Sequence, residues 1–156
     1  MIRVLFICHG NICRSPMAEF LFQDMLIKKG LYQKFYIASA ATSREEIGNT
    51  VYPPAKKKLN SLEIDCSKKT ARQVTKQDYV DFDYLLVMEA YNTKNLMRIL
   101  QDDPQKKVYR LLDFSQNPRD IADPWYSGNF DITHTDIMEG LEGFLVFALS
   151  NENNCK

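Results

Sequence analysis

The chain has 156 residues, of which 45% are hydrophobic and 26% are charged, enough apolar material for one globular domain. Its 20 basic and 20 acidic residues give a formal net charge of zero, which argues against nucleic-acid binding because that requires a basic excess. No apolar run approaches the roughly 18 residues of a membrane span, and four cysteines in a chain of this length do not indicate a disulfide framework.

These limits predict a single domain over residues 1–156. We expect it to be cytoplasmic with reduced thiols and monomeric, with no nucleic-acid or membrane partner.

The predicted elements alternate between strands and helices. Residues 2–7 form an almost continuous apolar run, typical of a strand buried on both faces. A helix is predicted to start with Ser15 as its N-cap and Pro16 at its first position, and Gly30 predicts its end.

Further strands are expected at 35–38, 84–88 and 108–111, and further helices at 55–59, 94–100 and 137–148. Thr133 and Asp136 predict a capping pair that opens the last helix. This order predicts a doubly wound α/β domain, in which helices cover both faces of a small parallel sheet of about four strands.

The most informative segment is the loop from Cys8 to Pro16, which follows the first strand and opens the first helix. Open α/β sheets bind anions at this place, where amide groups and the helix dipole attract negative charge. Gly10 and Asn11 tolerate positive φ, so a tight loop can turn its amides inward. Curled around an oxyanion, the loop would place a sulfur from Cys8 beneath phosphorus and the guanidinium of Arg14 beside its oxygens.

Inward amides, the helix N-terminus and Arg14 all favour the nucleophilic thiolate of Cys8, and Ser15 can donate a hydrogen bond to it. A nucleotide-binding Walker loop is excluded because the Gly-Lys-Ser/Thr ending is absent. Two alternatives stay open. One is an inert buried Cys8, and the other is an irregular zinc site built from Cys8, Cys13, His9 and His134.

A second segment, residues 121–128, supplies a candidate acid. Pro124 stiffens the backbone beside Asp123, Gly128 loosens it beyond, and Trp125 and Tyr126 can sandwich a phenyl ring. The alternative is that Asp-Pro is an ordinary turn. Paired with the Cys8 loop, Asp123 becomes the leading candidate for the proton donor on a mobile loop.

Together the two segments resemble the low-molecular-weight protein tyrosine phosphatases, whose signature is Cys-x5-Arg-Ser-Pro near the N-terminus and Asp-Pro with aromatics near the C-terminus. Residues 39–43, 47–49 and 71–74 also look like this family, so the resemblance spans nearly the whole chain. It implies that Cys8 attacks phosphorus to form a phosphocysteine, and that Arg14 and the loop amides hold phosphate. Asp123 would then serve as general acid and base. The family uses no metal or cofactor, and its partners are phosphotyrosine-containing proteins.

The resemblance also implies secondary roles. Asn11 and Ser39 resemble a pair that braces the loop, and Cys13 matches a cysteine that forms a reversible disulfide with the nucleophile. Arg44 and Glu45 occupy a segment that varies with substrate preference. The predicted substrate-binding residues are His9, Gly10, Asn11, Ile12, Cys13, Ser15, Glu45, Trp125 and Tyr126.

Three positions depart from the family pattern. His9 replaces an apolar residue, Lys69 replaces a histidine found in some members, and Trp125 replaces the more common tyrosine. We interpret His9 either as a residue of the pocket rim or as an imidazolium that favours the thiolate. Only the imidazolium would add a titration to the pH–rate profile.

Two rival functions remain. Thioredoxin-coupled arsenate reductases share the loop but need a downstream cysteine relay, and only Cys66 and Cys155 lie downstream here. A silent phosphotyrosine-binding module would have lost the nucleophile or the acid, and both are present.

Overall fold

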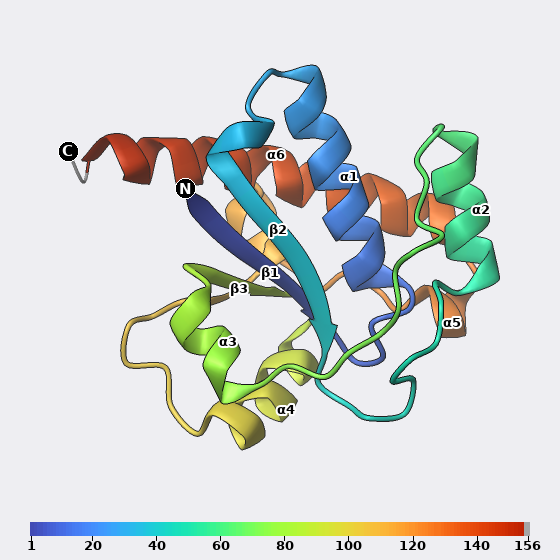
Figure 1. Cartoon of the computed structure of the whole chain (residues 1–156), viewed down its shortest axis with the longest axis horizontal. Helices are drawn as coiled ribbons and strands as arrows, with labels where there is room; N and C mark the ends of the chain where they lie inside the picture. Colours follow the sequence, from blue (N-terminus) through green and yellow to red (C-terminus); the bar gives the residue numbers. More distant parts are fainter. Residues whose placement is uncertain (155–156) are drawn as a thin grey trace.

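The predicted strands form one parallel sheet in the computed structural model, which describes residues 1–154 (Figure 1). The strands are β1 (Ile2–Cys8), β2 (Phe35–Ala41), β3 (Tyr84–Val87) and β4 (Val108–Arg110). Their order across the sheet is β2-β1-β3-β4, and every neighbouring pair is parallel. The arrangement confirms the predicted α/β class.

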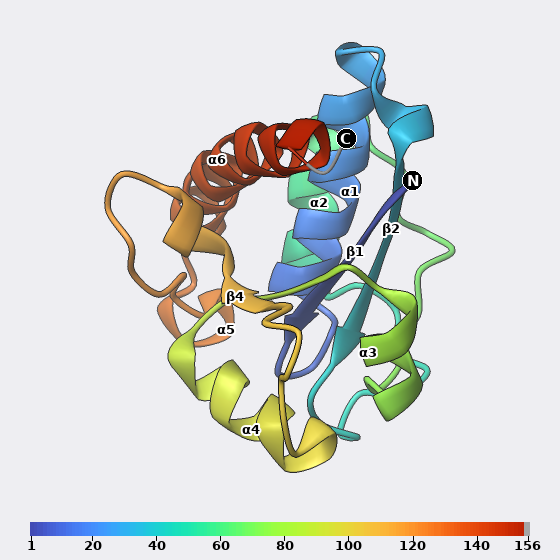
Figure 2. The same cartoon turned by 90° about the vertical axis from the view of Figure 1, so that its left-hand side faces the viewer.

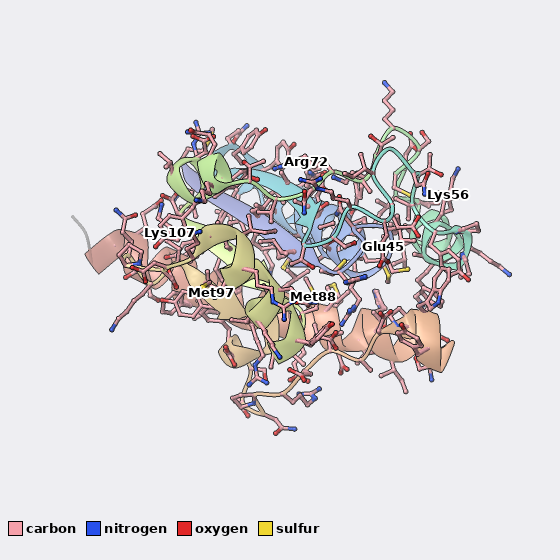
Figure 3. All side chains as sticks on the ribbon, turned by 90° about the horizontal axis from the view of Figure 1, so that it is seen from below. Glu45, Lys56, Arg72, Met88, Met97 and Lys107 are labelled. Atoms are coloured by element: carbon pink, nitrogen blue, oxygen red, sulfur yellow. The ribbon has the colours of Figure 1, made fainter. Side chains whose placement is uncertain are left out.

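Both faces of the sheet are covered by helices, as predicted (Figures 1 and 2). On one face lie α1 (Arg14–Lys28) and α6 (Phe130–Asn154), against which α2 (Pro53–Ser61) packs. On the other face lie α3 (Lys76–Asp81) and α4 (Ala90–Leu100), and Figure 3 views the molecule from this side with Met97 of α4 labelled. The remaining elements are η1 (Tyr32–Lys34), η2 (Leu111–Phe114) and α5 (Pro124–Ser127).

Alternation along β1 explains the two cores. Val4 and Phe6 point into the larger core with α1 and α6, whereas Leu5 and Ile7 point into the smaller core with β3 and α4. Because β1 lies inside the sheet and both of its faces are covered, its side chains are apolar at nearly every position. The carboxyl end of this rigid strand carries the loop that begins at Cys8.

The first helix begins differently from the prediction. It starts at Arg14 with Cys13 at the N-cap, so Ser15 lies inside the first turn and does not cap the helix. Pro16 also lies in that turn, where its missing N–H would have no helical partner. Gly30, with a φ of 70°, follows the last residues of α1 as predicted.

The last helix begins before the predicted capping pair. Asn129 Oδ1 accepts from the Ile132 N–H at 3.0 Å, and α6 starts at Phe130, so Thr133 and Asp136 lie inside it. Their side chains bind elsewhere, since Asp136 pairs with Arg119 at 2.8 Å. The elements α3, α5, η1 and η2 were not predicted, because short helices carry little periodicity.

None of the helices within residues 1–154 has the length and apolar character needed to cross a membrane.

Close packing of α6 against η2 gives a test of the fold. A Cβ atom added at Gly143 would lie 2.1 Å from the Phe114 carbonyl oxygen, which belongs to the backbone and cannot rotate away. We therefore expect Gly143→Ala to lower the free energy of unfolding by about 3 kcal/mol in urea denaturation, despite alanine's better helix propensity. Ser150→Ala, on the exposed part of the same helix, should change it by less than about 0.5 kcal/mol. Equal effects would contradict the close approach.

Candidate active site

The loop between β1 and α1 forms the floor of the candidate site. Cys8 is buried, and its Sγ lies 3.0 Å from Ser15 Oγ and accepts from the Asn11 N–H at 3.3 Å. Asn11 has a φ of 60°, as expected from a residue that tolerates the left-handed region. Gly10 does not adopt positive φ, so the tight turn rests on Asn11 alone.

The amide of Asn11 sets the direction of hydrogen bonds in the loop. Its Nδ2 donates to Ser15 Oγ at 2.8 Å and to Ser39 Oγ at 2.9 Å, and its Oδ1 accepts from the Arg72 N–H. Since Ser15 accepts from Asn11, its single hydroxyl proton is free to point at Cys8 Sγ. The hydroxyl is thereby oriented as a donor toward the Cys8 sulfur.

Behind Ser39 lies a buried ion pair. Ser39 Oγ donates to Glu19 Oε1 at 2.5 Å, and the Lys69 ammonium lies 3.7 Å from the same oxygen. Lys69 also donates to the Ser39 carbonyl at 3.0 Å. Burial raises the pKa of Glu19 against the opposing effect of Lys69, and burial lowers the pKa of Lys69 against the effect of Glu19.

Arg14 is the most deeply buried charge of the site, with only 2% of its side chain exposed. Its Nη1 donates to the Ile121 carbonyl at 2.8 Å, and its two nitrogens lie 3.2 and 3.3 Å from the oxygens of Glu89. Burial opposes its charge, but Cys8, Glu89 and Asp123 together raise the Arg14 pKa above the ordinary value. The guanidinium is therefore held charged and in a fixed plane.

Asp123 is the last residue of the non-helical segment that the sequence predicts, immediately before the short helix α5. It caps α5, where its Oδ1 accepts from the Trp125 N–H at 3.0 Å. Its Oδ2 lies 3.4 Å from Arg14 Nη2. Gly128 ends this turn with a φ of 71°. A carboxylate thus lies in direct contact with the Arg14 guanidinium at the wall of the pocket.

A cavity of about 250 Å³ joins these groups and has room for one phosphorylated side chain. Trp125 and Tyr126 are its exposed walls, and the ring of Tyr52 packs against Trp125 with centroids 4.6 Å apart. His9 Nε2 pairs with Glu45 Oε2 at 3.0 Å on the rim. The lining residues are Cys8, His9, Gly10, Ile12, Cys13, Arg14, Glu45, Glu46, Asp123, Trp125 and Tyr126.

The predicted residues thus separate into two groups. Ten of the lining residues were predicted, whereas Asn11, Ser15 and Ser39 lie behind the loop and do not line the cavity. The sequence reasoning missed Glu46, which lines the pocket, and Glu89, which binds Arg14. Glu89 directly follows the third predicted strand, so its place at the carboxyl edge of the sheet was the signal that could have identified it.

Within residues 1–154, no three histidine, cysteine or acidic side chains form a group able to hold a metal ion. His134 lines a different cavity, beside Leu21 and Met138, so it does not join Cys8, Cys13 and His9. The thiols of Cys8, Cys13 and Cys66 are free, and Cys155 lies outside the described residues.

The ion pair behind the loop gives a stability test. The side chains of Glu19 and Lys69 are only 12% and 13% exposed, so removing one charge leaves the other buried without a partner. We expect Glu19→Gln to lower the free energy of unfolding by about 3 kcal/mol, and Glu19→Gln with Lys69→Met to recover most of that loss. Urea denaturation measures both, with the exposed Lys68→Met as control. A double variant as unstable as the single one would contradict the pairing.

Comparisons with known proteins identify the family of the chain. Residues 3–154 match the family model described as low molecular weight phosphotyrosine protein phosphatase. The chain is 40% identical over 147 residues to the low molecular weight protein-tyrosine-phosphatase YfkJ of Bacillus subtilis, with 93% of this chain and 94% of the relative covered. The crystal structure of YfkJ has a TM-score of 0.91 at 39% identity, with 97% and 96% covered.

Two further matches extend the range of organisms. The human low molecular weight phosphotyrosine protein phosphatase is 37% identical over 134 residues, with 82% of each chain covered. The structure of DARP, a drosophila arginine phosphatase, has a TM-score of 0.84 at 27% identity, with 94% of this chain and 98% of that chain covered. On the family match and these identities, the chain belongs to the low molecular weight phosphotyrosine protein phosphatase family.

Proposed function

We propose that the chain hydrolyses phosphotyrosine in proteins through a phosphocysteine intermediate, with residues 1–156 acting as one catalytic domain. The observation that carries the proposal is that Cys8, Arg14 and Asp123 line one pocket, with Arg14 and Asp123 in contact at 3.4 Å. A single phosphoryl group in this pocket could contact a nucleophile, a cationic ligand and a proton donor together.

In the first step the Cys8 thiolate attacks phosphorus, and the bond between phosphorus and the tyrosine oxygen breaks. Arg14 and the inward amides bind the non-bridging oxygens, on which negative charge is held in the transition state. Protonated Asp123 gives its proton to the departing tyrosine oxygen. The proposed role of Arg14 in binding phosphate is supported by its buried guanidinium, which is already held in place by Glu89 and the Ile121 carbonyl.

In the second step water attacks the phosphocysteine, and the Asp123 carboxylate takes the proton from that water. The bond between phosphorus and sulfur breaks, phosphate leaves, and the Cys8 thiolate is restored. Ser15 stabilises this leaving thiolate by donating its hydroxyl proton, a role supported by its 3.0 Å contact with Sγ. The hydroxyl orientation in turn depends on Asn11, which donates to both Ser15 and Ser39.

The walls support an aromatic substrate. Ile12 and Trp125 offer apolar surface on which a phenyl ring can pack, with Tyr126 beside them. We assign substrate contacts at the rim to His9 and Glu45, which lie where the protein around the phosphotyrosine would approach.

The rival functions receive less support. Cys66 is buried in the hydrophobic core with Val51, Ala55 and Leu59, so it is poorly placed to relay a disulfide from the pocket. A silent binding module is disfavoured because the pocket holds both Cys8 and Asp123.

The first test is steady-state hydrolysis of an aryl phosphate and of a phosphotyrosine peptide. We expect Cys8→Ser to abolish turnover, because serine is not ionised at working pH, and Asp123→Ala to lower kcat/KM for the peptide by about 100-fold. The control is Asp102→Ala, an exposed carboxylate outside the pocket, which should retain full activity. Turnover of phosphoarginine but not of phosphotyrosine would contradict the proposed substrate, and full activity of Cys8→Ser would contradict the mechanism.

We also propose a redox role for Cys13 in a cytoplasmic monomer, where reducing conditions preserve the Cys8 thiolate. Burial, and then the charges of Cys8 and Asp123, raise the pKa of the Cys13 thiol far above its ordinary value. Peroxide, with one proton from the solvent, would convert the Cys8 thiolate to a sulfenic acid and release water, which removes the Cys8 charge. Cys13 would then displace the sulfenic hydroxyl as a second water and form a disulfide.

Mass spectrometry after mild peroxide should therefore detect a Cys8–Cys13 disulfide, and a thiol reductant should restore activity. Cys13→Ser should instead give over-oxidised Cys8 and irreversible loss. The matched control is Cys66→Ser, which removes a buried thiol outside the pocket and should behave like the wild type. Sulfonic Cys8 beside a free Cys13 in the wild type would refute the protective role.

A further inference from the structure

The segment between η2 and α5, residues 115–123, delivers Asp123 to the pocket. Near its end Ile121 is fully buried, its N–H donates to the Met88 carbonyl at 2.9 Å, and its carbonyl accepts from Arg14. Beyond Ile121, Asp123 is bound to its own short helix and to Arg14. The place of the acid therefore depends on what holds this segment against the sheet.

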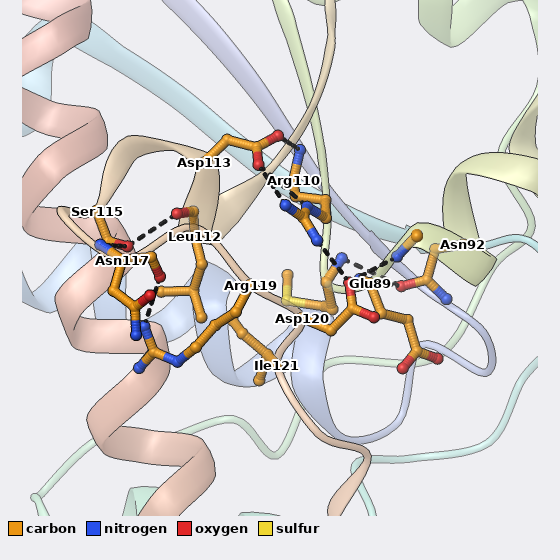
Figure 4. Close-up of polar contacts among 12 residues, drawn as sticks. Glu89, Asn92, Arg110, Leu112, Asp113, Ser115, Asn117, Arg119, Asp120 and Ile121 are labelled. Carbon is orange, nitrogen blue, oxygen red and sulfur yellow. Dashed lines mark hydrogen bonds and ion pairs between the residues drawn. The ribbon is translucent and has the colours of Figure 1, made fainter.

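Asp120 is bound to two groups outside the segment (Figure 4). Its Oδ1 accepts from the Ala90 N–H at 2.9 Å and from Arg110 Nη1 at 3.0 Å. Ala90 is the first residue of α4, so its N–H has no partner within the helix and attracts a carboxylate. Arg110 ends β4 and is itself held by Asp113, whose Oδ1 accepts from Arg110 Nε at 3.0 Å.

The N-terminus of α4 also holds Arg14, the residue proposed to bind phosphate. Glu89, which precedes Ala90, contacts both Nη atoms of the Arg14 guanidinium. The turn is fixed by Asn92, whose Oδ1 accepts from the Met88 and Glu89 amides at 3.1 Å each. Glu89 and Ala90 thus connect one rigid helix end to Arg14 and to the segment that carries the acid.

We infer that Asp120 is a positioning residue for the general acid: its carboxylate, held by the Ala90 amide and Arg110, fixes the segment so that Asp123 reaches the leaving oxygen. This inference rests on the proposed role of Asp123. Asp120 does not line the pocket, and 48% of its side chain is exposed. A contact of this exposure contributes little to stability, so its effect is expected in proton transfer, which requires close placement.

Leaving-group dependence separates this role from a structural one. A nitrophenolate departs readily without a proton, whereas an unsubstituted phenolate, like that of tyrosine, needs the acid. For Asp120→Ala we expect kcat/KM to fall about tenfold more for phenyl phosphate than for 4-nitrophenyl phosphate. Asp120→Asn keeps an oxygen acceptor for the Ala90 amide and should recover most of that difference.

The matched control is Asp113→Ala, which removes the other partner of Arg110 but leaves the Ala90 contact in place. It should keep the ratio of the two kcat/KM values within about twofold of the wild type. Equal losses on both substrates for Asp120→Ala, or no loss, would overturn the inference. Asp123→Ala, measured alongside, should change the ratio most. If it does not, the acid assignment fails and the inference with it, whereas a response at Asp123 but not at Asp120 rejects the inference alone.

Discussion

The buried charge of Arg14 is the constraint on which the rest of the site depends. A guanidinium removed from water carries a large desolvation cost unless its N–H groups and its charge are both compensated. Here the compensation comes from three places far apart in the sequence: Glu89 after β3, the carbonyl of Ile121, and Asp123 at the start of α5. The side chain proposed to bind phosphate therefore also contacts the segment that carries Asp123 and the N-terminus of α4.

A second consequence of burial is that hydrogen-bond directions inside the loop are determined. Asn11 uses both amide protons on Ser15 and Ser39, so each hydroxyl must donate elsewhere: Ser39 to Glu19, and Ser15 to Cys8. The Glu19 carboxylate, paired with Lys69, ends the chain on the side away from the pocket. The charge behind the loop thereby fixes the orientation of the Ser15 hydroxyl proton next to Cys8 Sγ.

Lys69 shows how a departure from the family pattern is accommodated. A lysine Nζ reaches Glu19 Oε1 and the Ser39 carbonyl, two acceptors that a ring nitrogen could also address. The cost is desolvation of an ammonium, which lowers the pKa of Lys69. The Glu19 carboxylate offsets that cost, and this explains why the two charges occur together in a region where neither would be stable alone.

Much of the site could be predicted from sequence because its chemistry is local. Residues 8–16 combine a strand end, a turn residue and a helix start within nine positions, and the residue types alone indicate an anion site. The contacts that fix Arg14 could not be predicted in this way, because Glu89 and Ile121 lie 75 and 107 residues from it. Glu89 and Arg14 come together because β1 and β3 are parallel neighbours in the sheet, so their carboxyl ends lie side by side.

The predicted starts of α1 and α6 were wrong for a related reason. Ser15 is a good capping residue, but its hydroxyl is committed to Cys8 and Asn11, and α1 therefore begins without a side-chain cap. Asp136 likewise forms an ion pair with Arg119 and does not cap α6. Local propensity identifies what a residue can do, whereas tertiary contacts select which of these it does.

The segment that carries Asp123 illustrates the difference between stability and precision. It is held by Arg119, which pairs with Asp136 and Glu139 of α6, and by Arg110, which pairs with Asp120. Exposed ion pairs of this kind contribute about 0–1 kcal/mol each to folding. Catalysis responds more steeply, since a displacement of about 1 Å at a reacting group costs about 100-fold in rate. Interactions that a stability measurement would hardly register can therefore control the chemistry, because they decide where a carboxyl group lies and not whether the chain folds.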